Sequence, residues 1–335
     1  MPKYAKSFKC TADGCRHSCC IGWQICIDEA TQEKYRREKD KLGEEILSSI
    51  EDGENGVCFK LIDGRCQNLD EQGLCRIIKG LGEGFLCDIC RLHPRYFSTF
   101  GSVMYGGIGL SCEEAARLIL SEDSEHAYCA EVARGDADND YDEVIFALIN
   151  ASMSRFIDIF TGSDKKFCEK LRECYALAKR LQGEIDGEEY EAPEVCATSL
   201  YDYFFKLEHL NPELMDALKL VTHENIPCSE LSDRYLSRLA IYFLDRYARD
   251  AAYDGNLIGR IVLLLLSVIT IGAMLGDGEW ELHSVIEAAR RFSAEVEYSE
   301  ENVEKIISDV KAEGIVRRIL SSGDKRLNFV QFKTR

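Results

Sequence analysis

Apolar and polar residues alternate with a helical period over most of the chain beyond residue 112. Apolar positions recur three or four residues apart, as in amphipathic helices that pack on a core. Residues 28–51 form a mostly polar stretch and predict a surface helix with Tyr35, Leu42, Ile46 and Ile50 turned inward. The pattern predicts further helices over residues 112–121, 142–161, 166–182, 237–254, 281–298 and 300–321.

One segment, residues 257–275, is apolar on nearly every side. Arg260 interrupts it and leaves only 261–275 free of charge, which is shorter than the ~20 residues of a membrane-spanning helix. No basic cluster lies beside it. The pattern therefore favours a buried central helix, with a membrane helix as the alternative.

Strand patterns are few. Residues 57–66 predict a short strand followed by an Asp-Gly turn, and residues 96–112, rich in glycine and aromatic side chains, predict a hairpin or an irregular loop. Residues 329–334 predict a terminal strand.

Composition places the chain among soluble globular proteins, with 46% hydrophobic and 30% charged residues. Acidic residues outnumber basic ones by 59 to 41, for a net charge of −18. Such a surface repels phosphate backbones and attracts lysine-rich protein surfaces, although it can also serve solubility alone. We expect no nucleic-acid partner and no membrane. The N-terminal "MPKYAKSFKC" lacks the apolar stretch of a secretory signal, so we expect a cytoplasmic protein.

Cysteines change the picture most, because eleven of the sixteen lie in the first 112 residues. In a reducing compartment, clustered cysteines are typical of metal ligands or catalytic thiols. Cys87 and Cys90 have the C-x2-C spacing of zinc and iron–sulfur sites. The adjacent Cys19 and Cys20 suit tetrahedral zinc poorly. The irregular spacing and the excess of thiols favour an iron–sulfur cluster, with zinc second and disulfides third.

These patterns together predict a mainly α fold. A Cys-rich N-terminal part with a few short strands, held together by metal, packs on a helical C-terminal part. We expect a metal-binding domain over residues 1–125 and a mostly helical domain over 140–335, separated by the acidic stretch "GDADNDYDE".

Arginines and histidines lie among the cysteines. Arg91 and Arg95 follow the C-x2-C pair, where they could clamp a carboxylate or offset cluster charge. His17 and His93 could replace a cysteine as metal ligands, or they could be surface histidines beside the site. No acid–base pair stands out, so the catalytic residues are unassigned.

The stretch "FKCTADGCRHSCCIGWQICIDEATQEKY", followed by "CQNLDEQGLCRIIKGLGEGFLCDICRLHPRYF" and "LSCEEAARLIL", resembles the flagellin lysine-N-methylase family. That family belongs to a wider group named for a CxxCxxCC zinc- or iron-chelating motif. Here the first run reads C-x4-C-x3-CC, which leaves open which of Cys10 and Cys15 is a ligand. Cys26 and Cys58 lie outside the family pattern. The cysteines that match it are Cys10, Cys15, Cys19, Cys20, Cys66, Cys75, Cys87, Cys90 and Cys112.

The resemblance implies a methyltransferase that moves a methyl group from S-adenosylmethionine to lysines of flagellin. It also implies a [4Fe-4S] cluster bound by N-terminal cysteines. Nine thiols exceed the four that one cubane needs, so either some lie beside the ligands or a second metal is present. We expect Arg91, Arg95, Trp23 and Tyr105 to contact S-adenosylmethionine, the aromatic rings by cation–π contact with its sulfonium. The alternative is a non-catalytic zinc- or iron-binding module with a structural metal.

Overall fold

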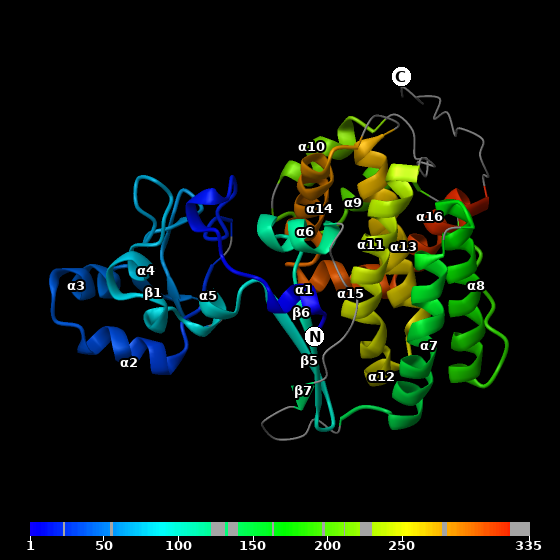
Figure 1. The fold of residues 1–335 in the computed structure, drawn as a ribbon, viewed down its shortest axis with the longest axis horizontal. Helices are drawn as coiled ribbons and strands as arrows, with labels where there is room; N and C mark the ends of the chain where they lie inside the picture. The colour runs from blue at the N-terminus through cyan, green and yellow to red at the C-terminus, as the bar shows by residue number, and fades with distance from the viewer. Residues whose placement is uncertain are drawn as a thin grey trace.

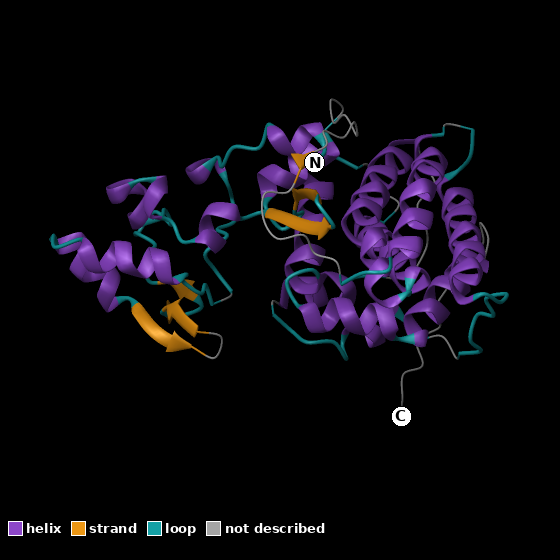
Figure 2. Cartoon of the chain, turned by 90° about the horizontal axis from the view of Figure 1, so that it is seen from below, coloured by secondary structure: helices purple, strands orange, loops and turns teal. Residues whose placement is uncertain are grey.

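Two lobes of different build make up the molecule, and two chain segments join them (Figure 1). The computed structural model describes residues 1–22, 24–53, 56–121, 131–132, 140–162, 164–195, 198–210, 212–221, 230–276 and 280–321. Most of these residues are helical and the strands are short (Figure 2), as the sequence predicts.

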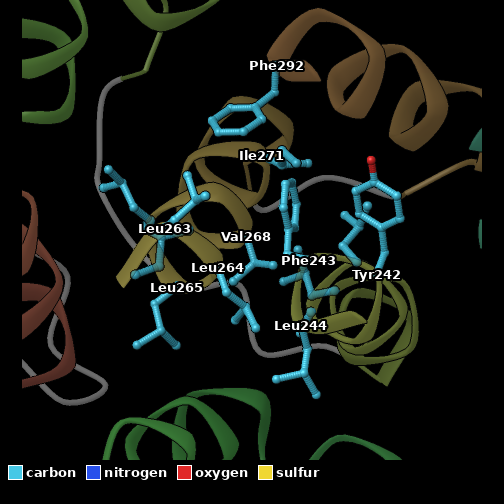
Figure 3. Packing of buried hydrophobic residues seen from close by; sticks show 14 of the residues in the cluster. Tyr242, Phe243, Leu244, Leu263, Leu264, Leu265, Val268, Ile271 and Phe292 are labelled. Atoms are coloured by element: carbon cyan, nitrogen blue, oxygen red, sulfur yellow. The ribbon is translucent and has the colours of Figure 1, made fainter. Parts of the chain in front are cut away.

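The larger lobe is a bundle of helices around α13 (Leu257–Leu275). Helix α13 is buried almost throughout and packs against α8, α11, α14, α15 and α16. Figure 3 shows Val268 and Ile271 of α13 in this core together with Phe243 of α11 and Phe292 of α14, whose ring centroids are 5.9 Å apart. The helices of this bundle are α7 (Glu143–Thr161), α8 (Phe167–Asp186), α9 (Leu200–Phe204), α10 (Pro212–Lys219), α11 (Glu230–Tyr247), η3 (Ala248–Asp250), α12 (Ala251–Asp254), α13, α14 (Leu282–Val296), α15 (Glu300–Ser308) and α16 (Val310–Ser321).

Helix α13 confirms the buried central helix that the sequence favours. Two helices, α7 and α13, are long and apolar enough to cross a membrane by length and composition alone. For α13, 94% of the most apolar stretch is buried inside the protein. At Gly259 a side chain has no room, because a Cβ there would lie 2.1 Å from the carbonyl oxygen of Ile307. The close approach of α15 to α13 therefore requires glycine at this position.

A three-stranded antiparallel sheet and two helices complete the larger lobe. The sheet has the order β5 (Arg95–Phe100), β6 (Val103–Ile108) and β7 (Glu131–Val132), so the predicted hairpin is present. Helices α1 (Lys3–Lys6) and α6 (Glu113–Leu120) pack on each other. Their side chains belong to the same hydrophobic cluster as the bundle, through Tyr4, Ala5 and Ala116 among others. Residues 1–8 and 108–120 thus share the core of the helical lobe, while the domain boundary predicted near residue 125 stays a prediction.

The smaller lobe contains the chain from about residue 9 to 92 and is rich in cysteine. Two antiparallel pairs of strands, β1 with β2 and β3 with β4, lie beside short helices. Its core contains Ile25, Tyr35 and Phe59 together with buried cysteines. Its elements are η1 (Ala12–Gly14), α2 (Glu29–Arg37), α3 (Lys41–Ser48), β1 (Ile50–Gly53), β2 (Gly56–Phe59), β3 (Leu61–Ile62), β4 (Arg65–Cys66), α4 (Arg76–Leu81), η2 (Glu83–Phe85) and α5 (Asp88–Leu92).

The surface helix predicted over residues 28–51 is wrong in its extent. The structure has two helices there, α2 and α3, separated by extended backbone at Glu38. Asp40 starts the second helix, because its side chain accepts a hydrogen bond from the amide of Gly43. Apolar periodicity continues across the break, so the capping aspartate was the informative signal. The predicted strand at 329–334 lies outside the described residues.

Candidate metal centre and the junction of the two lobes

Five cysteines lie in or against the core of the smaller lobe, and a sixth, the exposed Cys19, adjoins them. The thiol of Cys20 lies within electrostatic range of Cys66 and Cys75, and Cys90 within range of Cys20 and Cys75. Side-chain hydrogen bonds also link adjacent Cys19 and Cys20, and Cys87 and Cys90, and Cys87 lies within electrostatic range of Cys66 and Cys75. The group therefore comprises Cys19, Cys20, Cys66, Cys75, Cys87 and Cys90, which we call the thiol cluster.

Backbone elements hold these thiols in place. The amide of Cys66 donates to the carbonyl oxygen of Cys20 at 2.9 Å, which joins β4 to the "CC" segment. Cys75 and Cys87 each stand directly before a short helix, α4 and α5. Amide groups in the first turn of each helix lie near the cysteine sulfur and act to lower the pKa of its thiol. Such donors favour a thiolate, the form that binds metals.

Burial opposes that charge. The pKa values of Cys66 and Cys75 are raised, mainly by burial, whereas the Cys20 hydrogen bond lowers the pKa of Cys19 to about 7. The Cys90 thiol likewise lowers the pKa of Cys87. Several thiolates this close in a buried place repel one another unless a cation neutralises them. The donor set, all sulfur with amide support, suits a thiolate-bound metal or cluster.

A second group of thiols lies toward the helical lobe. The Cys15 thiol lies within electrostatic range of Cys10, Cys19 and Glu113, and its Sγ is 2.9 Å from the hydroxyl of Thr11. Cys112 precedes α6 and interacts with Cys15 and Cys19.

The nine predicted ligands thus divide into the thiol cluster and this neighbouring group, with Cys19 between them. In the described part of the chain, no three His, Cys, Asp or Glu side chains already have the arrangement of a metal site. Which of the nine are ligands stays a prediction.

The residues predicted to contact S-adenosylmethionine have different surroundings. Arg91 is exposed and pairs with Asp88 at 2.7 Å. The Arg95 guanidinium lies 5.1 Å from the ring of Phe8. Tyr105 carries the guanidinium of Arg249 over its ring at 4.4 Å, in an aromatic group with Phe100 and Phe146. The structure does not bring these three side chains around one common partner. Trp23 lies outside the described residues.

Polar contacts join the two lobes next to the thiols. Arg16 pairs with Glu113 at 2.9 Å, and His17 pairs with Glu287 of α14 at 2.8 Å. His17 thus contacts a carboxylate, which favours the surface role of this histidine over metal binding.

The other histidine considered as a ligand, His93, also faces the helical lobe. The Ser111 hydroxyl donates to the Tyr298 hydroxyl at 2.8 Å, which in turn lies 3.0 Å from Nδ1 of His93. Burial lowers the pKa of His93 to about 4, so the ring is neutral at pH 7 and Nδ1 can accept a hydrogen bond from the Tyr298 hydroxyl. Tyr298 is 38% exposed and lies within electrostatic range of Cys19 and Cys112. This chain of groups connects solvent, thiols and the helical core.

A buried acid sits deeper on the same side. Glu297 has a side chain only 1% exposed, and it accepts hydrogen bonds from the hydroxyls of Tyr242 and Tyr247, each at 2.9 Å. The Arg246 guanidinium lies 3.2 Å from Glu297 and 4.6 Å from the centre of the Tyr96 ring. Burial raises the pKa of all three tyrosines, so they remain protonated donors.

Asp245 of α11, next to Arg246, is a buried carboxylate with few neighbouring groups that stabilise its charge. Its side chain is 4% exposed, and neither carboxylate oxygen has a hydrogen-bond partner among the described residues. Arg249 Nη1 lies 4.0 Å away. Burial raises the pKa of Asp245 to about 7, although Arg249 acts in the opposite direction. Sequence reasoning missed this residue and Glu297, because acidic residues are common along the whole chain.

A pocket of about 370 Å³ opens elsewhere in the helical lobe. It lies among the ends of α8, α12 and α15 and the beginnings of α13 and α16, and its polar lining includes Asp186, Asp254, Asp309 and Glu313. All four acids already have partners. Gln182 donates to Asp186 and the Lys311 amide to Asp309, Arg260 pairs with Asp254, and Tyr190 donates to Glu313. The pocket shares no residue with the thiol cluster.

The fold defines a mainly α protein with a small lobe in which several cysteine side chains lie near one another. Three known proteins are similar to it over 128 residues, or 36% of this chain. The lysine-N-methylases of Salmonella typhimurium and Salmonella choleraesuis are each 31% identical over 32% of their length, and the flagellar biosynthetic protein FliU of Salmonella muenchen is 30% identical over 76% of its length. The chain therefore belongs to the flagellin lysine-N-methylase family that its sequence resembles.

The similarity covers only part of the longer relatives. The chain spans about a third of the length of the two lysine-N-methylases it matches. No family model matches the chain, and no solved structure matches it.

Proposed function

We propose that this chain is a protein-lysine N-methyltransferase that transfers a methyl group from S-adenosylmethionine to lysine side chains of flagellin. Support comes from membership in a family whose relatives are named for lysine methylation and for flagellar biosynthesis. The net charge of −18 also suits a lysine-bearing protein substrate. Free thiols in such number fit a reducing compartment, so we propose a cytoplasmic location.

We further propose that the thiol cluster holds a [4Fe-4S] cluster through four of its six cysteines. The observation that carries this proposal is the convergence of thiols from four separate stretches of chain, the buried Cys66 and Cys87 and the partly buried Cys20 and Cys75. When bound, iron supplies the positive charge that keeps these thiolates deprotonated. The protein supplies burial and the amide donors at the starts of α4 and α5.

The junction of the lobes is the place we propose for the reacting lysine. Methyl transfer to an amine needs a neutral lysine, a fixed approach to the sulfonium and exclusion of water. Tyr298 and His93 lie at the edge of solvent and beside the thiols. The Tyr298 hydroxyl and the neutral His93 imidazole can orient the lysine amine. The neighbouring Glu297, with its hydrogen bonds from Tyr242 and Tyr247, holds the backbone next to Tyr298 in place.

Methyl transfer is tested with labelled S-adenosylmethionine and the flagellin of the same organism. We expect label on flagellin lysines, located by mass spectrometry of peptides. Replacement of Cys87 by serine should abolish it, whereas Cys168→Ser, a buried cysteine of α8 in the other lobe, should leave it within about twofold. Absence of label with protein of full metal content would contradict the proposed activity.

The cofactor is tested separately, on protein purified without oxygen. An iron–sulfur cluster gives a brown protein with broad absorption at about 400 nm and equal amounts of iron and acid-labile sulfide. A colourless protein with stoichiometric zinc would support the alternative, a metal that serves structure alone. Calorimetric titration with S-adenosylmethionine separates that alternative from an enzyme, because a non-catalytic module gives no heat.

A further inference from the structure

Two cysteines outside the family pattern face each other in the smaller lobe. Cys26 lies in the segment before α2, and Cys58 lies in β2, where the two form an antiparallel bridge. The amide of Ile27 donates to Val57 at 2.8 Å and the amide of Phe59 to Ile25 at 3.0 Å. These bonds flank the pair, so Cys26 and Cys58 occupy a non-hydrogen-bonded position of the ladder. Opposite side chains come closest at such positions, with Cα atoms about 4.5 Å apart.

The two sulfur atoms are correspondingly close. Sγ of Cys26 lies 2.8 Å from Sγ of Cys58, and both are free thiols. A Cα separation of about 4.5 Å falls within the range that disulfides span. Cys58 is fully buried, whereas Cys26 is partly exposed and can meet a small reagent. The Cys58 thiol interacts with Cys26, with Glu51 and with the carbonyl oxygen of Gly56, which lies 3.3 Å away, and none of these groups belongs to the thiol cluster.

We propose that Cys26 and Cys58 form a reversible disulfide, a modification site separate from the metal ligands. The Cys26 thiolate attacks a small-molecule disulfide, such as oxidised glutathione, and releases one thiol to give a mixed disulfide. The Cys58 thiol then loses its proton, attacks the Cys26 sulfur and releases the second thiol. Two protein thiols are oxidised and one external disulfide is reduced to two thiols, so electrons and protons balance. Excess reduced thiol reverses both steps.

The bond would close a loop that contains α2 and α3. That loop supports the ligand-bearing segment, because Asp28 accepts a hydrogen bond from the amide of Asp88 and the Tyr35 hydroxyl donates to the carbonyl of Phe85. Both partners lie beside Cys87. Oxidation therefore restrains the loop that supports the segment around Cys87. It does so without using a thiol of the candidate metal site.

The test uses the full chain purified without oxygen, treated with oxidised glutathione, then alkylated, digested and analysed by mass spectrometry. We expect a peptide pair joined through Cys26 and Cys58, and its loss on reduction or in the Cys26→Ser variant. The buried Cys168 of the other lobe serves as the internal reference for unspecific oxidation. Iron and sulfide contents should not change on oxidation. Alkylation of both cysteines under these conditions, or linkage of either to a different cysteine, overturns the proposal.

A second measurement does not depend on peptide mapping. Oxidation should raise the melting temperature of the smaller lobe by about 10 °C, because a cross-link over a loop of this size restricts the unfolded chain. The Cys26→Ser variant should fold, since its side chain is partly exposed, and should show no such rise. An equal rise in the variant and in the unsubstituted protein would also overturn the proposal.

Discussion

The two lobes reach a folded state by different physical means. The helical lobe buries one extended hydrophobic cluster around α13, in which most large apolar side chains lose nearly all contact with water. The smaller lobe has eight buried apolar residues in its cluster, and two of them are cysteines. A core of that size supplies little net stability, so small domains commonly add metals or cross-links. Cysteines thus form part of the small core of one lobe, whereas the core of the other is rich in leucine and phenylalanine.

Removal of the proposed cluster should have the largest effect, because it should unfold one lobe and leave the other folded. We expect that anaerobic chelation of iron, or the paired variant Cys87→Ser with Cys90→Ser, unfolds the smaller lobe and leaves the helical lobe folded. Limited proteolysis should then cut within residues 9–92 while a helical fragment persists, and helical circular dichroism should fall only in part. Loss of both lobes in one transition would show that they do not differ in the way proposed.

The reverse test is a cavity in the larger lobe. Leu264 is fully buried in α13, so Leu264→Ala should cost about 3 kcal/mol of unfolding free energy. Denaturant unfolding followed by helical circular dichroism measures it, and the visible absorption of the smaller lobe should be unchanged. Leu220→Ala is the matched control, because that side chain is 81% exposed and should change stability by less than about 0.5 kcal/mol.

Asp245 offers a pH-dependent test within the helical lobe. The pKa of Asp245 in the folded protein, about 7, is above its ordinary value. The contribution of Asp245 to the free energy of unfolding is therefore greatest at low pH and is lost as the pH rises toward 7. Tyr4, Tyr96, Arg249 and the amino group of Met1 are the other titratable or charged groups that act with it.

Replacement of Asp245 by asparagine removes the loss of stability that accompanies ionisation of this carboxyl group. Asp245→Asn should stabilise the protein by about 2 kcal/mol at pH 8 and by much less at pH 4.5. Melting temperatures at the two pH values measure the difference. An equal effect at both would contradict a raised pKa.

The smallest effect is expected at the junction between the lobes. Arg16→Ala removes the pair with Glu113, and because Arg16 is 56% exposed, the cost should be below about 1 kcal/mol. Thermal unfolding in low and high salt measures it, and the difference from the unsubstituted protein should shrink in salt. A larger cost would mean that the lobes depend on each other for folding.

Sequence patterns predicted the elements better than the site. The apolar run of 257–275 coincides with α13, because a helix that is apolar on all sides has no stable place except a core. The break at Asp40 escaped a prediction based on apolar spacing alone.

The sequence predicts that the N-terminal cysteines come together, but it does not predict which of them lie close to one another. Which cysteines meet depends on contacts between Cys20 and segments 46 to 70 residues away, which no local spacing encodes. Asp245 and Glu297 escaped for the same reason, since acidic residues are common in this chain and burial alone makes these two distinctive.

The chain leaves and re-enters the helical lobe at neighbouring points, since Arg95 at the start of β5 stacks on Phe8 just after α1. Residues 9–92 are therefore, in topology, an insertion whose ends meet. Excision of the insertion and closure of the gap with a short glycine–serine linker should leave a self-sufficient helical protein. Conversely, the insertion is a module that could be grafted into another surface loop, where the proposed iron–sulfur cluster should still assemble.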